Sequence, residues 1–169
     1  MTRVLLSLSL LILVASSVHA QDCSDFSAPE LDLELPANWH VHTSEHHDAL
    51  GLAHHLMMNE QQTLALQIDS WQADTLPSYS AKDWAAGSYI QRIGDADRIA
   101  AVVLPHLGLA QETHAAFLIE RATERYYAIY FAYEGHYYMV TLGGKTEAFA
   151  AGVDELNAML ASVRLPQTT

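Results

Sequence analysis

The sequence predicts an α+β fold in which a mostly antiparallel β-sheet is flanked by helices, as in an α/β/α sandwich. Several short segments alternate apolar and polar residues, which is typical of half-buried strands. Two of these segments are joined by a two-residue turn, and a later segment carries an apolar stripe at helical spacing. Because short turns join antiparallel strands, these observations favour an antiparallel sheet.

The first half of the chain is predicted to contain four strands. In "ELDLEL" (30–35) leucines alternate with acidic residues, and Pro36 ends the strand because proline cannot donate to a strand ladder. "PANW" turns the chain into a second strand from Trp39, and "HHDALG" turns it again into a third at about 52–59. "TLALQID" (63–69) carries its apolar residues on one face and makes the fourth.

The next segment changes to helical spacing. Ser80 and Asp83 have the spacing of a helix cap, and apolar residues recur at helical spacing until Gly94. "RIAAVVLP" (98–105) is compatible with a buried strand or with a continued helix, whereas "HAAFLIE" (114–120) predicts a strand.

The clearest hairpin is "YYAIYFAYEGHYYMVTL" (126–142). Glu134-Gly135 makes a two-residue loop, and pairing Tyr133 with His136 sets the register. One side then becomes an apolar layer that pairs Phe131 with Tyr138, Ile129 with Val140 and Tyr127 with Leu142. The other side pairs Ala132 with Tyr137, Tyr130 with Met139 and Ala128 with Thr141. Since neither side is polar, we expect both faces of the sheet to be covered.

A final helix is predicted to supply one of these covers. Its apolar residues recur every three or four positions, as one face of a helix requires, at Phe149, Val153, Leu156, Leu160 and Val163. The helix gives way to "SVRLP".

The first residues predict export. Arg3 precedes an apolar run, and "VHA" supplies the small residues of a cleavage site, so Met1–Ala20 is expected to be a secretory signal peptide. The run is too short for a membrane span, which takes about 20 apolar residues. We expect cleavage after Ala20, a flexible segment over 21–29, a single α+β domain over 30–166, and a location in the periplasm or outside the cell.

The cysteine content and the charge limit the classes of partner. Cys23 is the single cysteine, so no internal disulfide is available, and it lies too far past Ala20 for a lipoprotein signal. The formal net charge is −12, which argues against nucleic acid and anionic lipid as partners. Such a charge favours a basic partner or cations, or it serves only to keep an exported protein soluble.

The stretch "WHVHTSEHHDALGLAHHLMMN" (39–59) raises the question of a metal site. If His42 faces His55 and His40 faces Met57 across the hairpin, all four side chains point outward on one surface. In that register the side chains that point into the core are Trp39, Val41, Leu56 and Met58. Three imidazoles and a thioether suit copper, and zinc is an alternative through the histidines alone. The competing interpretation is a set of ordinary exposed histidines.

Catalytic motifs are absent from the sequence pattern. Serines and histidines that a hydrolase could use occur without a G-x-S-x-G frame, at Ser70, Ser88, His106, His114 and His136. Scattered residues of these types are expected in any chain of this length. We therefore predict a protein that is not an enzyme, and keep an envelope hydrolase as the third interpretation.

Two fragments resemble a known family. "LPANWHV" (35–41) after an opening strand, and "LASVRLP" (160–166) at the end of a closing helix, resemble the two ends of the PsbP-like and DcrB-like proteins, which are small, often exported α/β/α sandwich proteins. The resemblance implies the sandwich fold and a non-enzymatic accessory role. The family includes photosystem accessory subunits, envelope proteins and chaperones or inhibitors of toxins, and it has no common catalytic set to transfer.

The function predicted from the sequence is that of an exported, acidic accessory protein that binds a partner, in the first place a protein. The expected contact lies on the hairpin side formed by Tyr130, Tyr137 and Met139, provided that the covering helices leave it open. The alternative is an envelope protein that binds copper or zinc through the histidine-rich hairpin. No other cofactor, no nucleic acid and no transmembrane segment in the mature chain are expected.

Overall fold

The computed structural model describes residues 25–28, 31–47, 52–72, 83, 96–104, 107, 114–133 and 135–164. Within these ranges the fold is a seven-stranded antiparallel sheet, a separate two-stranded sheet and two helices. The predicted α+β fold with a mostly antiparallel sheet is therefore confirmed. The helix expected over 80–94 lies outside these ranges apart from Asp83, as does the signal peptide expected over 1–20.

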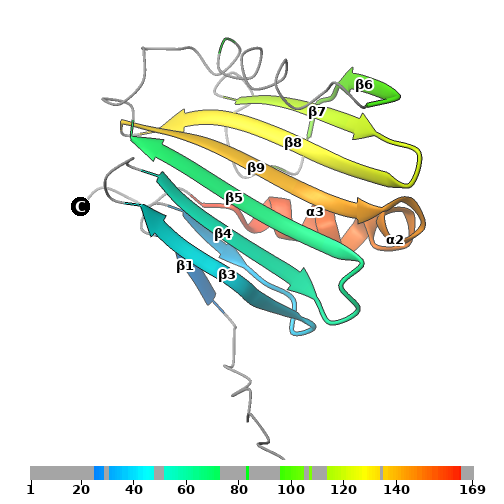
Figure 1. The fold of residues 1–169 in the computed structure, drawn as a ribbon, viewed down its shortest axis with the longest axis horizontal. Helices are drawn as coiled ribbons and strands as arrows, with labels where there is room; N and C mark the ends of the chain where they lie inside the picture. Colours follow the sequence, from blue (N-terminus) through cyan, green and yellow to red (C-terminus); the bar gives the residue numbers. More distant parts are fainter. Residues whose placement is uncertain are drawn as a thin grey trace, which may run out of the picture.

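The strands of the large sheet lie in the order β3-β4-β5-β9-β8-β7-β6 (Figure 1). Their bounds are β3 Trp39–His47, β4 Leu52–Asn59, β5 Leu64–Gln72, β6 Arg98–Ala101, β7 His114–Glu120, β8 Glu124–Tyr133 and β9 His136–Lys145. The small sheet pairs β1 (Asp25–Ala28) with β2 (Leu31–Glu34), and the helices are α2 (Thr146–Ala151) and α3 (Val153–Ser162). The segment expected to be flexible over 21–29 thus contains a strand.

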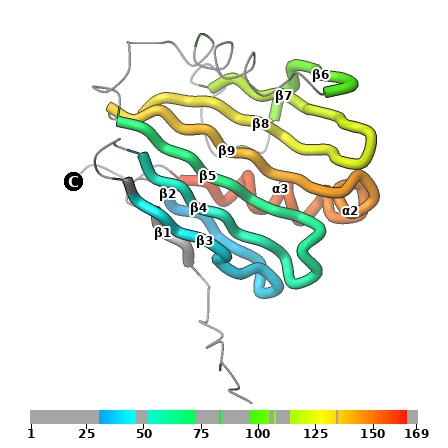
Figure 2. Tube along the Cα trace, viewed as in Figure 1, coloured from blue at the N-terminus to red at the C-terminus, as the bar shows by residue number. Residues whose placement is uncertain are grey.

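Both helices and the β1–β2 hairpin lie on the same side of the large sheet (Figure 2). The chain end after α3 is tied to β2 by a β-bridge, in which Asp32 and Arg164 exchange backbone hydrogen bonds of 3.0 and 2.8 Å. We call the sheet face that α2 and α3 cover the helix face, and the opposite face the distal face.

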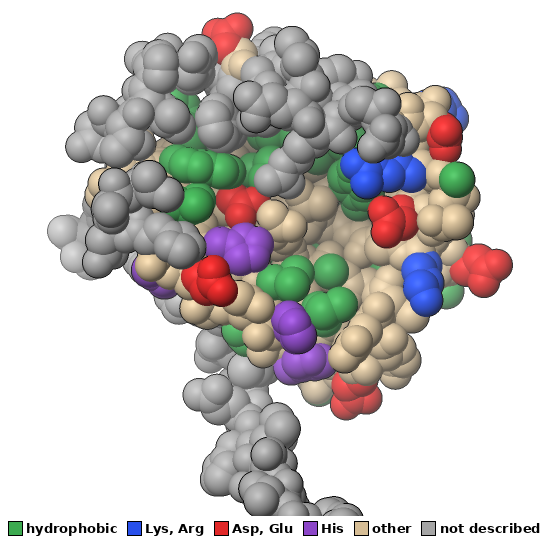
Figure 3. Space-filling view, in the orientation of Figure 1, with side chains coloured by type: hydrophobic (Ala, Val, Ile, Leu, Met, Phe, Trp, Pro, Cys, Tyr) green, Lys and Arg blue, Asp and Glu red, His purple; other side chains and the backbone are tan. Residues whose placement is uncertain are grey.

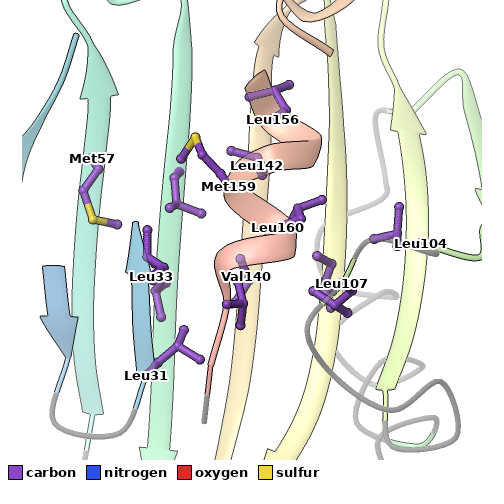
Figure 4. Close-up of a cluster of buried hydrophobic side chains, with 14 of the residues drawn as sticks. Leu31, Leu33, Met57, Leu104, Leu107, Val140, Leu142, Leu156, Met159 and Leu160 are labelled. Atoms are coloured by element: carbon purple, nitrogen blue, oxygen red, sulfur yellow. The ribbon is translucent and has the colours of Figure 1, made fainter. Parts of the chain in front are cut away.

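The main hydrophobic core fills the space between the helix face and α3. The helix residues Leu156, Met159 and Leu160 are surrounded by side chains of three strands (Figure 4). These side chains are Leu31 and Leu33 of β2, Met57 of β4, and Val140 and Leu142 of β9. Leu31 and Leu33 are buried while Asp32 and Glu34 are exposed, so the alternation predicted for this segment is confirmed, although β2 pairs with β1 and not with the large sheet.

The β8–β9 hairpin has the predicted register. Tyr133 pairs with His136, and every further predicted pair from Phe131 with Tyr138 to Tyr127 with Leu142 is present. Gly135 has a φ of 79°, the left-handed conformation that glycine adopts at no steric cost in such a turn.

The register of β3 against β4 differs from the prediction. Val41 pairs with Met57, and the strand then bulges at His42, so that Ser44 pairs with His55. The expected pairs of His40 with Met57 and of His42 with His55 are therefore wrong. A one-residue change of register turns each side chain to the other face of the sheet.

The neighbouring strand β5 explains this register. Its apolar residues Leu66 and Ile68 face the core, and the β4–β5 pairing sets Met57 opposite Leu66 and His55 opposite Ile68. Asn59 holds the intervening turn, because its Oδ1 accepts hydrogen bonds from the backbone N–H groups of Thr63 (2.9 Å) and Leu64 (3.1 Å). Met57 and His55 are thereby placed on the helix face, while Leu56 and Met58, which were expected in the core, lie on the distal face.

The predicted final helix is interrupted. Gly152 separates α2 from α3, and its N–H donates to the carbonyl oxygen of Ala148 (2.9 Å). A Cβ at Gly152 would lie 3.0 Å from Leu64 Cδ1, so glycine allows the chain to pass close to β5 here. Four of the five predicted apolar residues are buried, namely Phe149, Leu156, Leu160 and Val163. No helix among the described residues is both long and apolar enough to cross a membrane.

Candidate functional site

A pocket of about 390 Å³ opens on the distal face (Figure 3). It lies over the centre of the sheet, where β5, β9 and β8 pair, and extends toward β7. Its lining residues are Gln67, Ile119, Arg121, Tyr126, Ala128, Tyr130, Met139 and Thr141. Strand alternation places these strand residues on the distal face, because their neighbours in sequence point into the main core.

The hollow results from a mixture of small and large side chains on adjacent strands. Ala128 pairs with Thr141 and Tyr126 pairs with Gly143, whereas Tyr130 pairs with Met139. A Cβ at Gly143 would come within 2.5 Å of Tyr126 Cα, so the two strands approach too closely there for any larger residue. The short side chains form the bottom of the pocket, and the larger ones of Tyr126, Tyr130 and Met139 form its walls.

One end of the pocket is cationic. The guanidinium of Arg121 lies 5.7 Å from the centre of the Tyr126 ring, within the range of a cation–π contact. Its side chain is 35% exposed and is 3.9 Å from the carboxylate of Glu124. An ion pair at such a distance and exposure contributes little to stability. Arg121 therefore presents a positive group beside an aromatic wall.

The opposite end is polar and ordered by Asp69. Gln67 Nε2 donates to Asp69 Oδ2 (2.6 Å), and His54 Nδ1 donates to Asp69 Oδ1 (2.6 Å). Asp69 is only 5% exposed, and its carboxylate accepts from both neighbours, as a buried carboxylate requires. Because Nε2 of Gln67 is used by Asp69, its carbonyl oxygen is left to accept a hydrogen bond from a group in the pocket.

The His54–Asp69 pair also orients an imidazole. With Nδ1 bound to the carboxylate, Nε2 of His54 points away from Asp69, and the side chain is 30% exposed. A carboxylate-oriented histidine is one part of a general-base arrangement, which also needs a nucleophile. Among the described residues no hydroxyl or thiol is hydrogen-bonded to His54. The hydrogen bond fixes the position of the His54 ring beside the buried carboxylate of Asp69.

The three residues predicted to contact a partner lie on the distal face, but all are buried. Tyr130 and Met139 line the pocket, whereas Tyr137 does not and lies further along β9, opposite Trp71. Of the three predicted contact residues, Tyr130 and Met139 therefore border the pocket, and Tyr137 is buried outside it.

The structure does not bring the four predicted metal ligands together. His55 and Met57 are buried on the helix face, and His40 and His42 are exposed. His40 pairs with Met58 and so lies on the distal face, away from Met57. The part of the chain that the structure describes contains no group of three or more His, Cys, Asp or Glu residues placed to hold a metal ion.

His55 has a structural environment instead. A hydrogen bond of 2.9 Å joins its Nδ1 to Ser44 Oγ, and its ring meets that of His46 edge to face at 5.3 Å. Burial, followed by the nearby His46 and His54, lowers the pKa of His55, and Asp69 opposes this effect. The folded protein therefore favours the neutral form of His55 over the charged form.

The serine and histidines considered for a hydrolase lie away from the pocket. Ser70 pairs with Tyr138, His136 pairs with Gln72, and His114 pairs with Phe131, and strand alternation places all three on the helix face. Ser88 and His106 lie outside the described residues.

Sequence reasoning missed the residues at both ends of the pocket. Gln67 and Asp69 alternate with Leu66 and Ile68, so their position on the distal face could have been inferred from strand periodicity. The pairing of Asp69 with His54 depends on the β4–β5 register, and the position of Arg121 depends on how β7 joins β8.

No protein-family model and no curated protein matches this sequence. Among solved structures, the chain is similar to CyanoP, the cyanobacterial PsbP of Synechocystis sp. PCC 6803, with a TM-score of 0.55 and 10% identity over 90% of this chain and 99% of that one. A Bacteroides thetaiotaomicron protein has a TM-score of 0.52 and 11% identity over 87% of this chain, which spans 50% of that protein's length. The Ran-binding protein Mog1p of Saccharomyces cerevisiae has a TM-score of 0.48 and 8% identity over 80% of this chain and 89% of that one. This chain therefore has a PsbP-like fold, as the resemblance at its two ends predicts.

Proposed function

We propose that this protein is an exported, non-enzymatic accessory protein that acts by binding a partner protein, and that part of the partner enters the distal pocket. The fold does not decide this role, because one fold hosts many functions. The observation that supports it is the pocket itself, which combines apolar walls with a cation at one end and an ordered amide at the other.

The size and construction of the pocket suit binding. Its volume of about 390 Å³ falls in the range of about 300–1,000 Å³ that is typical of ligand sites. Most of the lining residues belong to paired strands, so the site is formed before a ligand arrives. A preformed site avoids the entropic cost of ordering its side chains on binding.

The charge of the chain bears on the class of partner. The sequence holds 20 acidic residues against 8 lysines and arginines, so long-range attraction favours a basic protein. A basic partner would be drawn to the surface as a whole, while the pocket would select one feature of it.

A site-specific photo-cross-linking experiment tests the proposal. A photoreactive residue at Thr141, which lines the pocket, is compared in cells of the source organism with the same residue at Ala158, which is exposed on α3. We expect one protein to be cross-linked from position 141 and not from position 158. The cross-linked protein is then identified, purified and titrated against the wild-type chain.

The proposal fails if cross-linking from position 141 does not exceed that from position 158, or if the purified partner does not bind. Export is tested separately by sequencing the N-terminus of the protein recovered from the periplasm or medium. We expect that sequence to begin at Gln21, and an intact Met1 in a cytoplasmic product would contradict export.

A further inference from the structure

Positive charge gathers at one end of the distal pocket. Arg98, Arg121 and Arg125 lie around Glu120 and Glu124 where β7 joins β8, and Lys145 pairs with Glu124 across the β8–β9 ladder. In Figure 3 the Lys and Arg side chains lie on the right of the face, at this end of the sheet. Cationic and acidic side chains thus alternate at this end of the sheet, in a chain with a formal net charge of −12.

Arg121 is the member of this group that lines the pocket. Glu120 is engaged by Arg125 at 2.5 Å and by Arg98 at 3.4 Å, so the charge of Glu120 is largely balanced by these two arginines. A guanidinium carries five N–H donors, so Arg121 can keep its contacts within the protein, that with Glu124 among them, and also donate to an anion in the pocket. The Tyr126 ring beside it excludes water from one side of the guanidinium, which strengthens such a contact.

The end of the pocket at Gln67 repels an anion and accepts a hydrogen bond from a donor group of a ligand. The buried carboxylate of Asp69 lies behind Gln67, and the Gln67 carbonyl oxygen is oriented by the 2.6 Å bond from its amide nitrogen to Asp69. An elongated ligand would therefore place its anionic group at Arg121 and an N–H or O–H group at Gln67.

The separation of the two ends sets the length of the ligand. Gln67 is on β5 and Arg121 follows β7, which is three strands away in the order β5-β9-β8-β7. Strand pairing puts Gln67 in one row with Phe117 of β7, and Arg121 is further along the chain. Three strand spacings of about 4.8 Å and an offset of about 13 Å along the strands put the two backbones about 20 Å apart, and both side chains extend inward from there. This space fits a short apolar group such as one aromatic residue with the peptide unit before it.

We propose that the distal pocket recognises a carboxylate joined to an apolar group, with Arg121 binding the carboxylate. The inference rests on the proposed function, since it names what enters the same pocket. Two sources share this chemistry, namely the C-terminus of a protein that ends in an apolar residue and a free organic acid. Tyr126, Tyr130 and Met139 contact the apolar group in either case.

Isothermal titration of the full mature chain with matched acids and amides tests the inference. The probes are acetyl-Ala-Ala-Phe with a free carboxylate, the same peptide as its amide, phenylbutyrate and phenylbutanamide. A charge-assisted hydrogen bond is worth about 1.5–3 kcal/mol, so at least one acid should bind about 10-fold or more tightly than its amide. Equal binding of acid and amide, or no binding of either acid, would overturn the proposal.

Two arginine variants identify the carboxylate site. Arg121→Gln should abolish the preference for the acid while leaving the weaker binding of the amide unchanged. Arg125→Gln is the matched control, because Arg125 belongs to the same cationic group but does not line the pocket, and it should keep the preference. Thermal midpoints of both variants verify that they are folded. A retained preference in Arg121→Gln would overturn the assignment of this residue.

The four probes also separate the two sources. Binding of the acid peptide indicates a protein C-terminus, whereas binding of phenylbutyrate alone indicates a free organic acid. The failure of this inference can be told apart from that of the proposed function. If a partner is cross-linked at position 141 but the acid and amide probes bind equally, the proposed function stands and the carboxylate inference is overturned. If the acid is preferred but no partner is cross-linked, the carboxylate inference stands and the proposed function is overturned.

Discussion

The two faces of the sheet are built from the same strands but organised differently. On the helix face, α3 and β2 close a continuous apolar core, and His55 is buried there, where its neutral form is favoured. On the distal face, the fully buried apolar cluster among the described residues is smaller, with partly buried side chains packed against it, and it adjoins the pocket and the Asp69 network. Its buried members are Ile119, Ala128, Tyr130 and Met139. The comparison indicates that, among the described residues, the larger buried apolar cluster lies on the helix face and the described pocket lies on the distal face.

The largest expected effect is the disruption of the helix face. Replacing Leu156, which is 0% exposed, by Asp removes its packing against the sheet and buries an unpaired charge. The loss of the leucine side chain alone costs about 2–5 kcal/mol, so the thermal midpoint should fall sharply or folding should fail. Ala158→Asp, on the exposed side of the same helix, is the control and should change stability by no more than about 0.5 kcal/mol. Equal effects of the two changes would show that α3 does not close the core.

The next effect concerns the polar network of the distal face. Asp69→Asn leaves a hydrogen-bonding side chain at the position but removes the charge that His54 and Gln67 donate to. We expect a loss of about 1–3 kcal/mol by denaturant unfolding, smaller than that of Leu156→Asp. A double-mutant cycle with His54→Gln should show coupling between the two residues, and strict additivity would contradict a direct bond.

A smaller effect should distinguish the two faces by pH. The pKa of His55 is lowered in the folded protein from the ordinary value of 6.5, so on acidification the unfolded state takes up its proton first. Stability should therefore fall as the pH drops through about 6.5 and level off below the folded pKa of His55. In His55→Gln the thermal midpoint should depend less on pH in this window. His40→Gln, at an exposed position of β3, is the matched control, and an equal change in the pH dependence of both variants would contradict the assignment to His55.

The smallest expected effect is that of Met57→Leu on metal affinity. Met57 lies on the helix face and His40 on the distal face, so they cannot bind one ion together. In titrations with Cu⁺, Cu²⁺ and Zn²⁺, Met57→Leu should change any affinity by less than about twofold, because a soft sulfur ligand is not being removed. A tenfold loss of metal affinity in Met57→Leu would show that the sulfur does contact a bound ion, and would support the metal site predicted from the sequence.

Local patterns in the sequence were sufficient for some elements. The β8–β9 register follows from the Glu134-Gly135 turn and from the apolar pairs on both strands, so each of its pairs could be predicted. The same periodicity placed Tyr130 and Met139 on one face, and the structure shows that they line the pocket.

The β3–β4 hairpin shows where local patterns are insufficient. Both faces of β4 mix apolar residues with histidine or asparagine, so periodicity does not decide which face is buried. The decision comes from β5, whose apolar face sets Met57 and His55 toward the core, and from the bulge at His42. A bulge moves the register by one residue and leaves no clear mark in the sequence.

By itself, the sequence determined the α+β class, the hairpin around Gly135, the apolar stripe of the last helix and the acidic charge of the chain, because each depends on near neighbours or on composition. Only the tertiary structure decided that Gln67, Asp69 and His54 form one network and that Arg121 lies at the other end of the same pocket. These residues come from strands that meet through pairings distant in sequence, such as that of β5 with β9. The periodicity of one strand predicts which residues lie on the same face of that strand. Which strand lies next to it, and in which register, is determined by the packing of the whole domain.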